Sequence, residues 1–126
     1  MLDASVLIGY LDASDAHHGR AAALLTREVD DDFAVNLLTL AEILVAPTRT
    51  GQRDKVLDIL DDLGVETLQF PAESAVTLAQ LRAETLLKMP DCCVLFSARV
   101  RQARLASFDE RVVKAARALG VGVADT

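Results

Sequence analysis

Apolar and polar positions follow two patterns along the chain, and together these patterns predict helices separated by short strands. In the longer segments apolar residues recur every three or four positions, as in a helix with one buried face, and short apolar runs lie between these segments. The predicted helices are Val6–Leu11, His17–Val29, Thr39–Val45, Arg53–Leu63, Ala72–Leu87, Asp91–Gln102 and Asp109–Leu119. The predicted strands are Met1–Asp3, Phe33–Val35, Val65–Leu68, Leu105–Ser107 and Val121–Val123.

Strands that alternate with helices predict the fold class. We expect an α/β protein, a three-layer sandwich with a central parallel sheet and helices on both faces. The length of 126 residues, with no repeat or linker, favours a single domain over residues 1–126. Sheets of this kind bind ligands at the carboxyl ends of their strands. Asp3 falls at the end of a predicted strand and Asp109 just beyond the end of another.

The composition narrows the function classes. Only four Phe and one Tyr are present, which argues against a protein that binds single strands by stacking bases on aromatic side chains. No apolar run reaches the roughly 18 residues that span a bilayer, so we expect a cytoplasmic protein without a membrane segment. Cys92 and Cys93 are adjacent and are interpreted as small buried residues, neither a disulfide nor a zinc site.

The net charge of −6, from 13 basic and 19 acidic residues, by itself argues against nucleic-acid binding. The argument weakens if some acids are metal ligands. Two divalent ions would cancel about four negative charges and turn an acidic pocket into one that binds phosphate.

Three acids stand among apolar residues, namely Asp3, Glu42 and Asp91. Burial of an ionised carboxylate is costly unless it is paired or bound to a metal, and few basic residues are close enough in sequence to pair with all three. A shared hard cation, Mg²⁺ or Mn²⁺, satisfies them together. Most other acids belong to surface patterns, either a charged turn or the polar face of one helix. These are Asp30, Asp31, Asp32, Asp54, Asp58, Asp61 and Asp62.

Structural explanations exist for several candidates taken singly. Thr39 to Glu42 and Ser107 to Glu110 both have the spacing of a capping box, in which the acid reaches back to the start of its own helix. Asp91 and Asp109 also suit the positive end of a helix dipole. The four acids together favour a site, because each lies at an element boundary or in an apolar context.

Four segments resemble the motifs of PIN-domain nucleases, in particular the VapC-type toxins of bacterial toxin–antitoxin pairs. The segment Leu2–Ile8 resembles the opening strand with its first acid. Leu38–Leu44 resembles the second motif, Leu81–Ala83 followed by Met89–Leu95 resembles the third, and Leu105–Arg111 resembles the fourth. The motifs occur in the family's order and cover nearly the whole chain.

The resemblance implies a PIN-like fold and hydrolysis of RNA phosphodiester bonds with one or two Mg²⁺ or Mn²⁺ ions. It implies that Asp3, Glu42 and Asp91 are the principal ligands, and that Asp109 is a further ligand or orients water. Ser5 and Ser107 would hold the carboxylates by hydrogen bonds. A VapB-like antitoxin and a homodimer are also implied.

Some interpretations remain open at this stage. Arg82 is a candidate contact for RNA phosphate, or else a surface or ion-paired arginine. His17 and His18 are interpreted as surface residues at a helix start. One alternative function is a PIN-fold protein that binds RNA or a partner without cutting. Another is a receiver-like phosphorelay domain, which lacks support because Gln69 and not an acid follows the strand Val65–Leu68.

Overall fold

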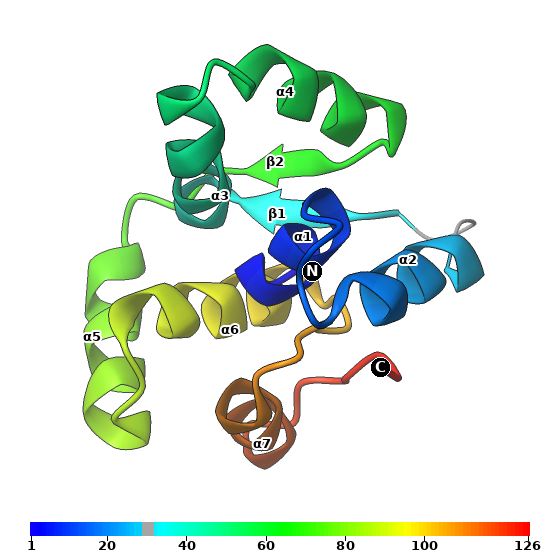
Figure 1. Ribbon diagram of the computed structural model, residues 1–126. Helices are drawn as coiled ribbons and strands as arrows, with labels where there is room; N and C mark the ends of the chain where they lie inside the picture. The colour runs from blue at the N-terminus through cyan, green and yellow to red at the C-terminus, as the bar shows by residue number, and fades with distance from the viewer. Residues whose placement is uncertain (29–31) are drawn as a thin grey trace.

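The computed structural model describes residues 1–28 and 32–126, and this part of the chain forms seven helices around a parallel sheet (Figure 1). The helices are α1 (Ala4–Leu11), α2 (His18–Arg27), α3 (Leu37–Arg49), α4 (Arg53–Asp62), α5 (Ser74–Thr85), α6 (Met89–Arg101) and α7 (Glu110–Ala118). The regular strands are β1 (Ala34–Asn36) and β2 (Glu66–Leu68). Val29, Asp30 and Asp31, which belong to a predicted helix end and a predicted charged turn, lie outside the described residues.

The sheet is wider than its two regular strands. β1 pairs with β2 in parallel, and the amide of Leu2 donates to the carbonyl of Ala34 at 2.8 Å. Single parallel bridges join Leu2 to Ala106 and Leu105 to Val123. The order across the sheet is therefore 66–68, 34–36, 1–3, 105–107 and 121–124. The predicted parallel sheet is confirmed. Numbered in chain order, its first segment is residues 1–3, its fourth is 105–107 and its fifth is 121–124, and these three are joined by single bridges.

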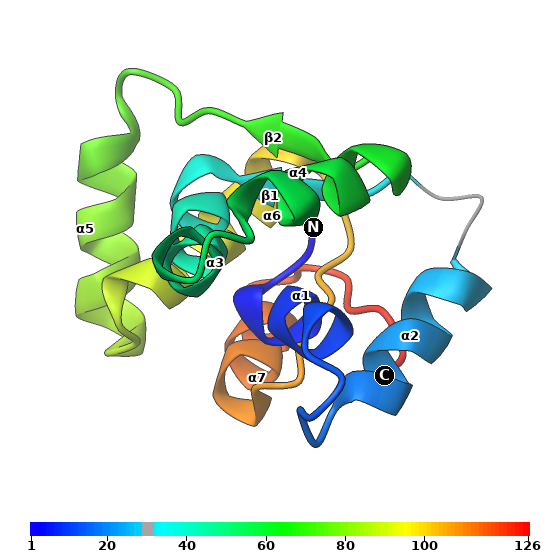
Figure 2. The ribbon, with the colours of Figure 1, turned by 45° about the horizontal axis from the view of Figure 1, so that its top comes forward.

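This strand order places the ends of two distant segments side by side. From the first segment the chain moves to one side of the sheet, through β1 and β2, and then returns to the other side at residues 105–107. Ligands bind where the strand order reverses in this way, outside the carboxyl ends of the strands. Figure 2 shows the first segment running through the middle of the molecule, next to β1. Asp3 ends that segment and Ser107 ends its neighbour.

Both faces of the sheet are covered, because successive strand residues point to opposite faces. Leu2, Val35 and Ala106 join a core cluster with α1, α2 and α4. Met1, Ala34 and Leu105 join a second cluster with α5, α6 and α7. The three-layer arrangement expected from the alternation of elements is confirmed.

Several element boundaries differ from the prediction for local reasons. Helix α1 begins two residues early because the side chain of Asp3 caps it. Helix α3 begins at Leu37, after the cap Asn36, and continues through Pro47 to Arg49, beyond the predicted end at Val45. Pro90 is the second residue of α6, a position where its missing N–H costs little. No helix among residues 1–28 and 32–126 is long and apolar enough to cross a bilayer.

Candidate active site

Asp3 is the buried acid at the end of the first segment, with 6% of its surface exposed. Its Oδ1 accepts a hydrogen bond from the amide of Ala4 at 2.8 Å. Its Oδ2 accepts from the hydroxyl of Ser107 at 2.6 Å and from that of Ser5 at 3.1 Å. Three donors therefore compensate the burial of this carboxylate and fix its orientation. Burial of Asp3 alone does not require a cation, contrary to the argument from its apolar neighbours.

The two serines also tie neighbouring segments together. The amide of Phe108 donates to Ser5 Oγ at 3.0 Å, and the amide of Asp109 donates to Ser107 Oγ at 3.0 Å. Each hydroxyl thus accepts a hydrogen bond from a backbone amide just after residues 105–107 and donates one to the carboxylate of Asp3. The structure brings both sequence-predicted serines to Asp3.

Ser107→Ala is expected to destabilise the protein by about 2 kcal/mol, because it removes a short hydrogen bond to a buried carboxylate. Ser5→Ala is the matched control, since Ser5 donates to the same oxygen over a longer distance and is less buried. Urea unfolding at neutral pH measures both variants. A smaller loss for Ser107→Ala than for Ser5→Ala would contradict this assignment.

Among the four candidate acids, Glu42 and Asp91 are the two without a partner in the described residues. Glu42 lies on the exposed surface of α3, and Asp91 is half-buried in the first turn of α6. No hydrogen bond or ion pair within residues 1–28 and 32–126 reaches either carboxylate. Most of the Glu42 side chain is exposed and not buried as predicted, because its apolar sequence neighbours point to other sides of the helix.

Glu42, Asp91 and Asp3 act on one another electrostatically. Partial burial raises the pKa of Glu42 above its ordinary value, and the negative charges of Asp3 and Asp91 raise it further. Partial burial also raises the pKa of Asp91, aided by Asp3 and Asp109 and opposed by Arg111 and Lys88. Negative charge therefore accumulates here with little compensation.

Asp109 differs from the other candidate acids because it forms an ion pair with Arg111. It caps α7, where Oδ1 accepts from the amide of Arg111 at 2.9 Å. The Arg111 guanidinium also donates to Oδ1 at 3.3 Å and to Oδ2 at 3.0 Å. These contacts hold the pKa of Asp109 below its ordinary value. Sequence reasoning missed Arg111; its position two residues after a helix cap was the available signal.

The capping boxes predicted as structural alternatives are not formed. Asn36 caps α3 by accepting from the amide of Thr39 at 2.8 Å, so Glu42 has no capping role. Asp109, and not Ser107, caps α7. Asp91 does lie at the positive end of a helix, which is compatible with a second role as a ligand. Asn36 is a further residue that sequence reasoning missed at this edge; its Nδ2 is buried without a partner in the described residues.

The side chains of the candidate site have the chemistry that a hard cation requires. Its oxygens come from carboxylates and hydroxyls, which Mg²⁺ and Mn²⁺ prefer. Within residues 1–28 and 32–126, no three His, Cys, Asp or Glu side chains converge closely enough to enclose an ion as they stand. Glu42 and Asp91 keep their oxygens free of described partners, so the chemistry of these residues fits such an ion.

Arg82 has a structural contact of its own. Its Nη1 donates to the carbonyl of Leu86 at 3.0 Å and also to that of Leu87, which closes the turn between α5 and α6. The ion pair proposed as its alternative is not formed with any described residue. A contact between Arg82 and RNA stays a prediction. The two histidines lie at the start of α2 as expected, where His17 stacks on Phe108.

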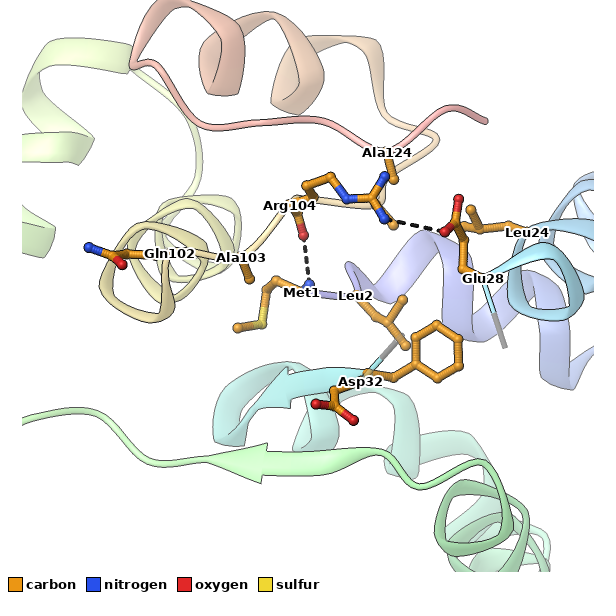
Figure 3. A pocket seen from close by; sticks show the side chains of 11 residues that line it. Met1, Leu2, Leu24, Glu28, Asp32, Gln102, Ala103, Arg104 and Ala124 are labelled. Atoms are coloured by element: carbon orange, nitrogen blue, oxygen red, sulfur yellow. Dashed lines mark hydrogen bonds and ion pairs between the residues drawn. The ribbon is translucent and has the colours of Figure 1, made fainter. Parts of the chain in front are cut away.

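The pocket in Figure 3 belongs to the opposite edge of the sheet. It is lined by residues at the amino ends of the strands, including Met1 and Arg104. The Met1 ammonium donates to the Arg104 carbonyl at 2.7 Å, and the Arg104 guanidinium pairs with Glu28 at 3.2 Å. The pocket therefore lies away from the carboxylates and is no part of the candidate site.

Comparison with known proteins assigns the family. The chain is similar to a chain in a toxin–antitoxin complex from Klebsiella pneumoniae, at 21% identity and a TM-score of 0.67. The match covers 86% of this chain and 84% of that one, and at this identity it shows a shared fold. No curated protein sequence matches. The family model of the PIN domain matches residues 1–118, nearly the full length, so the chain belongs to the PIN domain family.

Proposed function

We propose that this chain is a divalent-metal-dependent endoribonuclease, formed by one PIN domain over residues 1–126, that hydrolyses RNA phosphodiester bonds. PIN domains are generally nucleases. The observation that carries the proposal is that Glu42 and Asp91 have no partner among the described residues and interact electrostatically with Asp3, which ends its segment at the carboxyl edge of the sheet. Acids gathered without a counter-ion are costly to the fold, and a cation offsets that cost.

In this proposal Asp3, Glu42 and Asp91 hold one or two Mg²⁺ or Mn²⁺ ions. When bound, the cation lowers the pKa of water and stabilises the charge that develops on the phosphate. Ser107 and Ser5 keep the Asp3 carboxylate turned toward the site through their hydrogen bonds. This preorganisation means that Asp3 loses little freedom when the site is filled.

Asp109 is proposed to orient the attacking water or to serve as a further ligand. Arg111 keeps the carboxylate ionised, since the pKa of Asp109 lies below its ordinary value. An ionised oxygen accepts a hydrogen bond from water and so fixes its direction. The same contact leaves Asp109 with less negative charge to offer than Glu42 or Asp91.

The pH dependence of stability provides a test that needs no substrate. In the folded protein Asp91 has a pKa raised above its ordinary value of 3.8. The folded state therefore keeps this proton to a higher pH than the unfolded state does. The contribution of protonated Asp91 to the free energy of unfolding is therefore full below pH 3.8, and it is lost as the pH rises through the raised pKa.

At neutral pH and without metal, Asp91→Asn is accordingly expected to raise the melting temperature, whereas at low pH the two proteins melt alike. Mg²⁺ is expected to stabilise wild type more than the variant. Thermal unfolding in EDTA and in Mg²⁺ measures both effects. A variant that is less stable than wild type at neutral pH without metal would contradict the electrostatic account.

The proposed reaction is tested with purified protein and labelled RNA. Structured and unstructured RNAs are incubated with Mg²⁺, Mn²⁺ or EDTA, and the products are separated by length. Internal cleavage with either metal and none in EDTA is expected. RNA binding without any cleavage would favour the alternative of a non-cutting PIN-fold protein. The receiver-like alternative is excluded by membership of the PIN family.

We further propose that the protein acts in the cytoplasm as the toxin of a VapBC-type pair, with a cognate VapB-like antitoxin and a homodimeric assembly. The fold shared with a chain of a toxin–antitoxin complex supports this role. Expression of wild type in bacteria is expected to arrest growth, and expression of Asp91→Asn is not. Equal growth of the two cultures at equal protein levels would contradict the toxin role.

A further inference from the structure

A groove of about 560 Å³ lies between the turn that joins α5 to α6 and helix α7, next to the candidate site acid Asp109. Figures 1 and 2 show α7 and the end of α5 on the same side of the molecule. Leu86 and Leu87 line one wall, and Arg111 and Lys114 line the other. Arg111 also contacts Asp109 and acts electrostatically on Asp91, so one end of the groove meets the candidate site.

The charged residues of the groove favour an anion. Nε and Nη2 of Arg111 donate to Asp109, and its side chain is 69% exposed, so the remaining edge of the guanidinium is open to a ligand. Lys114 is exposed one helical turn further along the same face, without an ion-pair partner among the described residues. Glu84 is the acid of the lining, and its Oε1 accepts from the Gln80 amide at 3.0 Å.

The apolar wall has an unusual backbone. Leu86 has a φ of +60°, a left-handed conformation that is costly for leucine, and its side chain is 81% exposed. Arg82 holds this turn through the carbonyls of Leu86 and Leu87, and the Thr85 hydroxyl accepts from the Leu87 amide at 3.3 Å. Two side chains thus keep an apolar residue facing outward opposite two cations.

We propose that this groove holds the single-stranded RNA segment next to the cleaved phosphodiester, with phosphates on Arg111 and Lys114 and a base against Leu86. The inference rests on the proposed function. A chain with a net charge of −6 needs locally concentrated cations to retain a polyanion, and the groove places two of them directly beside the carboxylates.

The test measures binding of a fluorescently labelled single-stranded oligoribonucleotide in EDTA at several KCl concentrations. Lys114→Ala is expected to weaken binding about threefold to fivefold and to lower the slope of log K against log salt by about 0.7. Leu86→Asn, which suits a left-handed backbone, is expected to weaken binding and leave that slope unchanged. Lys55→Ala is the matched control, because Lys55 is equally an exposed helix lysine but lines a different groove, beside α1 and α3.

The outcomes separate the two proposals. If wild type cleaves RNA, and Lys114→Ala binds with the affinity and salt slope of wild type and Lys55→Ala, the groove is overturned and the proposed function stands. If wild type neither binds nor cleaves RNA, the proposed function is overturned and the groove with it. A loss confined to Lys114→Ala and Leu86→Asn supports the groove.

Discussion

Asp91→Asn is expected to lower the single-turnover rate of RNA cleavage by about a thousandfold. A metal ion contributes several kcal/mol of transition-state stabilisation, and each 1.36 kcal/mol is a factor of ten in rate. Asparagine keeps the shape of the side chain but removes the charge of a carboxylate that has no described protein partner. The loss should therefore exceed that of any single hydrogen bond in the site.

The loss of activity by Asp91→Asn has a clear control. Asp58→Asn changes an exposed acid on α4 and should cleave at the wild-type rate. Unfolding does not account for inactivity at position 91, because removal of that charge is expected to stabilise the metal-free protein at neutral pH. Cleavage by Asp91→Asn within about threefold of wild type would show that Asp91 is no principal ligand.

Leu105→Ala is expected to cost about 3–5 kcal/mol of unfolding free energy, a large share of the roughly 5–15 kcal/mol that stabilises a protein of this size. Leu105 is fully buried in the sheet segment 105–107, which lies between residues 1–3 and residues 121–124. Its amide donates to Gly122 and its carbonyl accepts from Ala124, both at 2.8 Å. Truncation leaves a cavity beneath the segment that carries Ser107.

Urea unfolding measures this loss, with Leu57→Ala as the matched control. Leu57 lies on α4 with 38% of its surface exposed, so its truncation should cost less than about 1 kcal/mol. Equal losses for the two variants would contradict the position of Leu105 at the centre of the core. Because the fourth segment supports Ser107, we also expect weaker cation binding by Leu105→Ala.

The fold was largely predictable because each element has its own apolar pattern and the alternation of strands and helices recurs along the chain. Apolar runs marked every segment of the sheet, and the order of strands and helices predicted a parallel sheet with two covered faces. The boundaries were less predictable because they depend on single side-chain contacts. The cap from Asn36 to Thr39 and the passage of α3 through Pro47 are examples, since each depends on backbone geometry that the residue types leave open.

The positions of the candidate acids were predictable, but the reason given for suspecting them was only partly correct. Asp3 is buried as its neighbours indicated, yet hydroxyls satisfy it. Glu42 is exposed, because in a helix the residues on either side of it point in other directions. Arg111 was missed because its pairing with Asp109 arises from the geometry of a helix cap. Asp109, the acid with the weakest argument from its neighbours, is also the one with a counter-ion.

Mn²⁺ binding, measured by calorimetry on wild type and Glu42→Gln, tests the central claim most directly. Glu42 is exposed and has no described hydrogen bond, so the substitution should leave the fold intact. Glu73→Gln, which changes an exposed acid at the start of α5, is the control. We expect wild type and Glu73→Gln to bind Mn²⁺ equally, and Glu42→Gln to bind at least about tenfold more weakly. Equal affinity of all three proteins, or no binding by wild type, would contradict a cation centre built on these carboxylates.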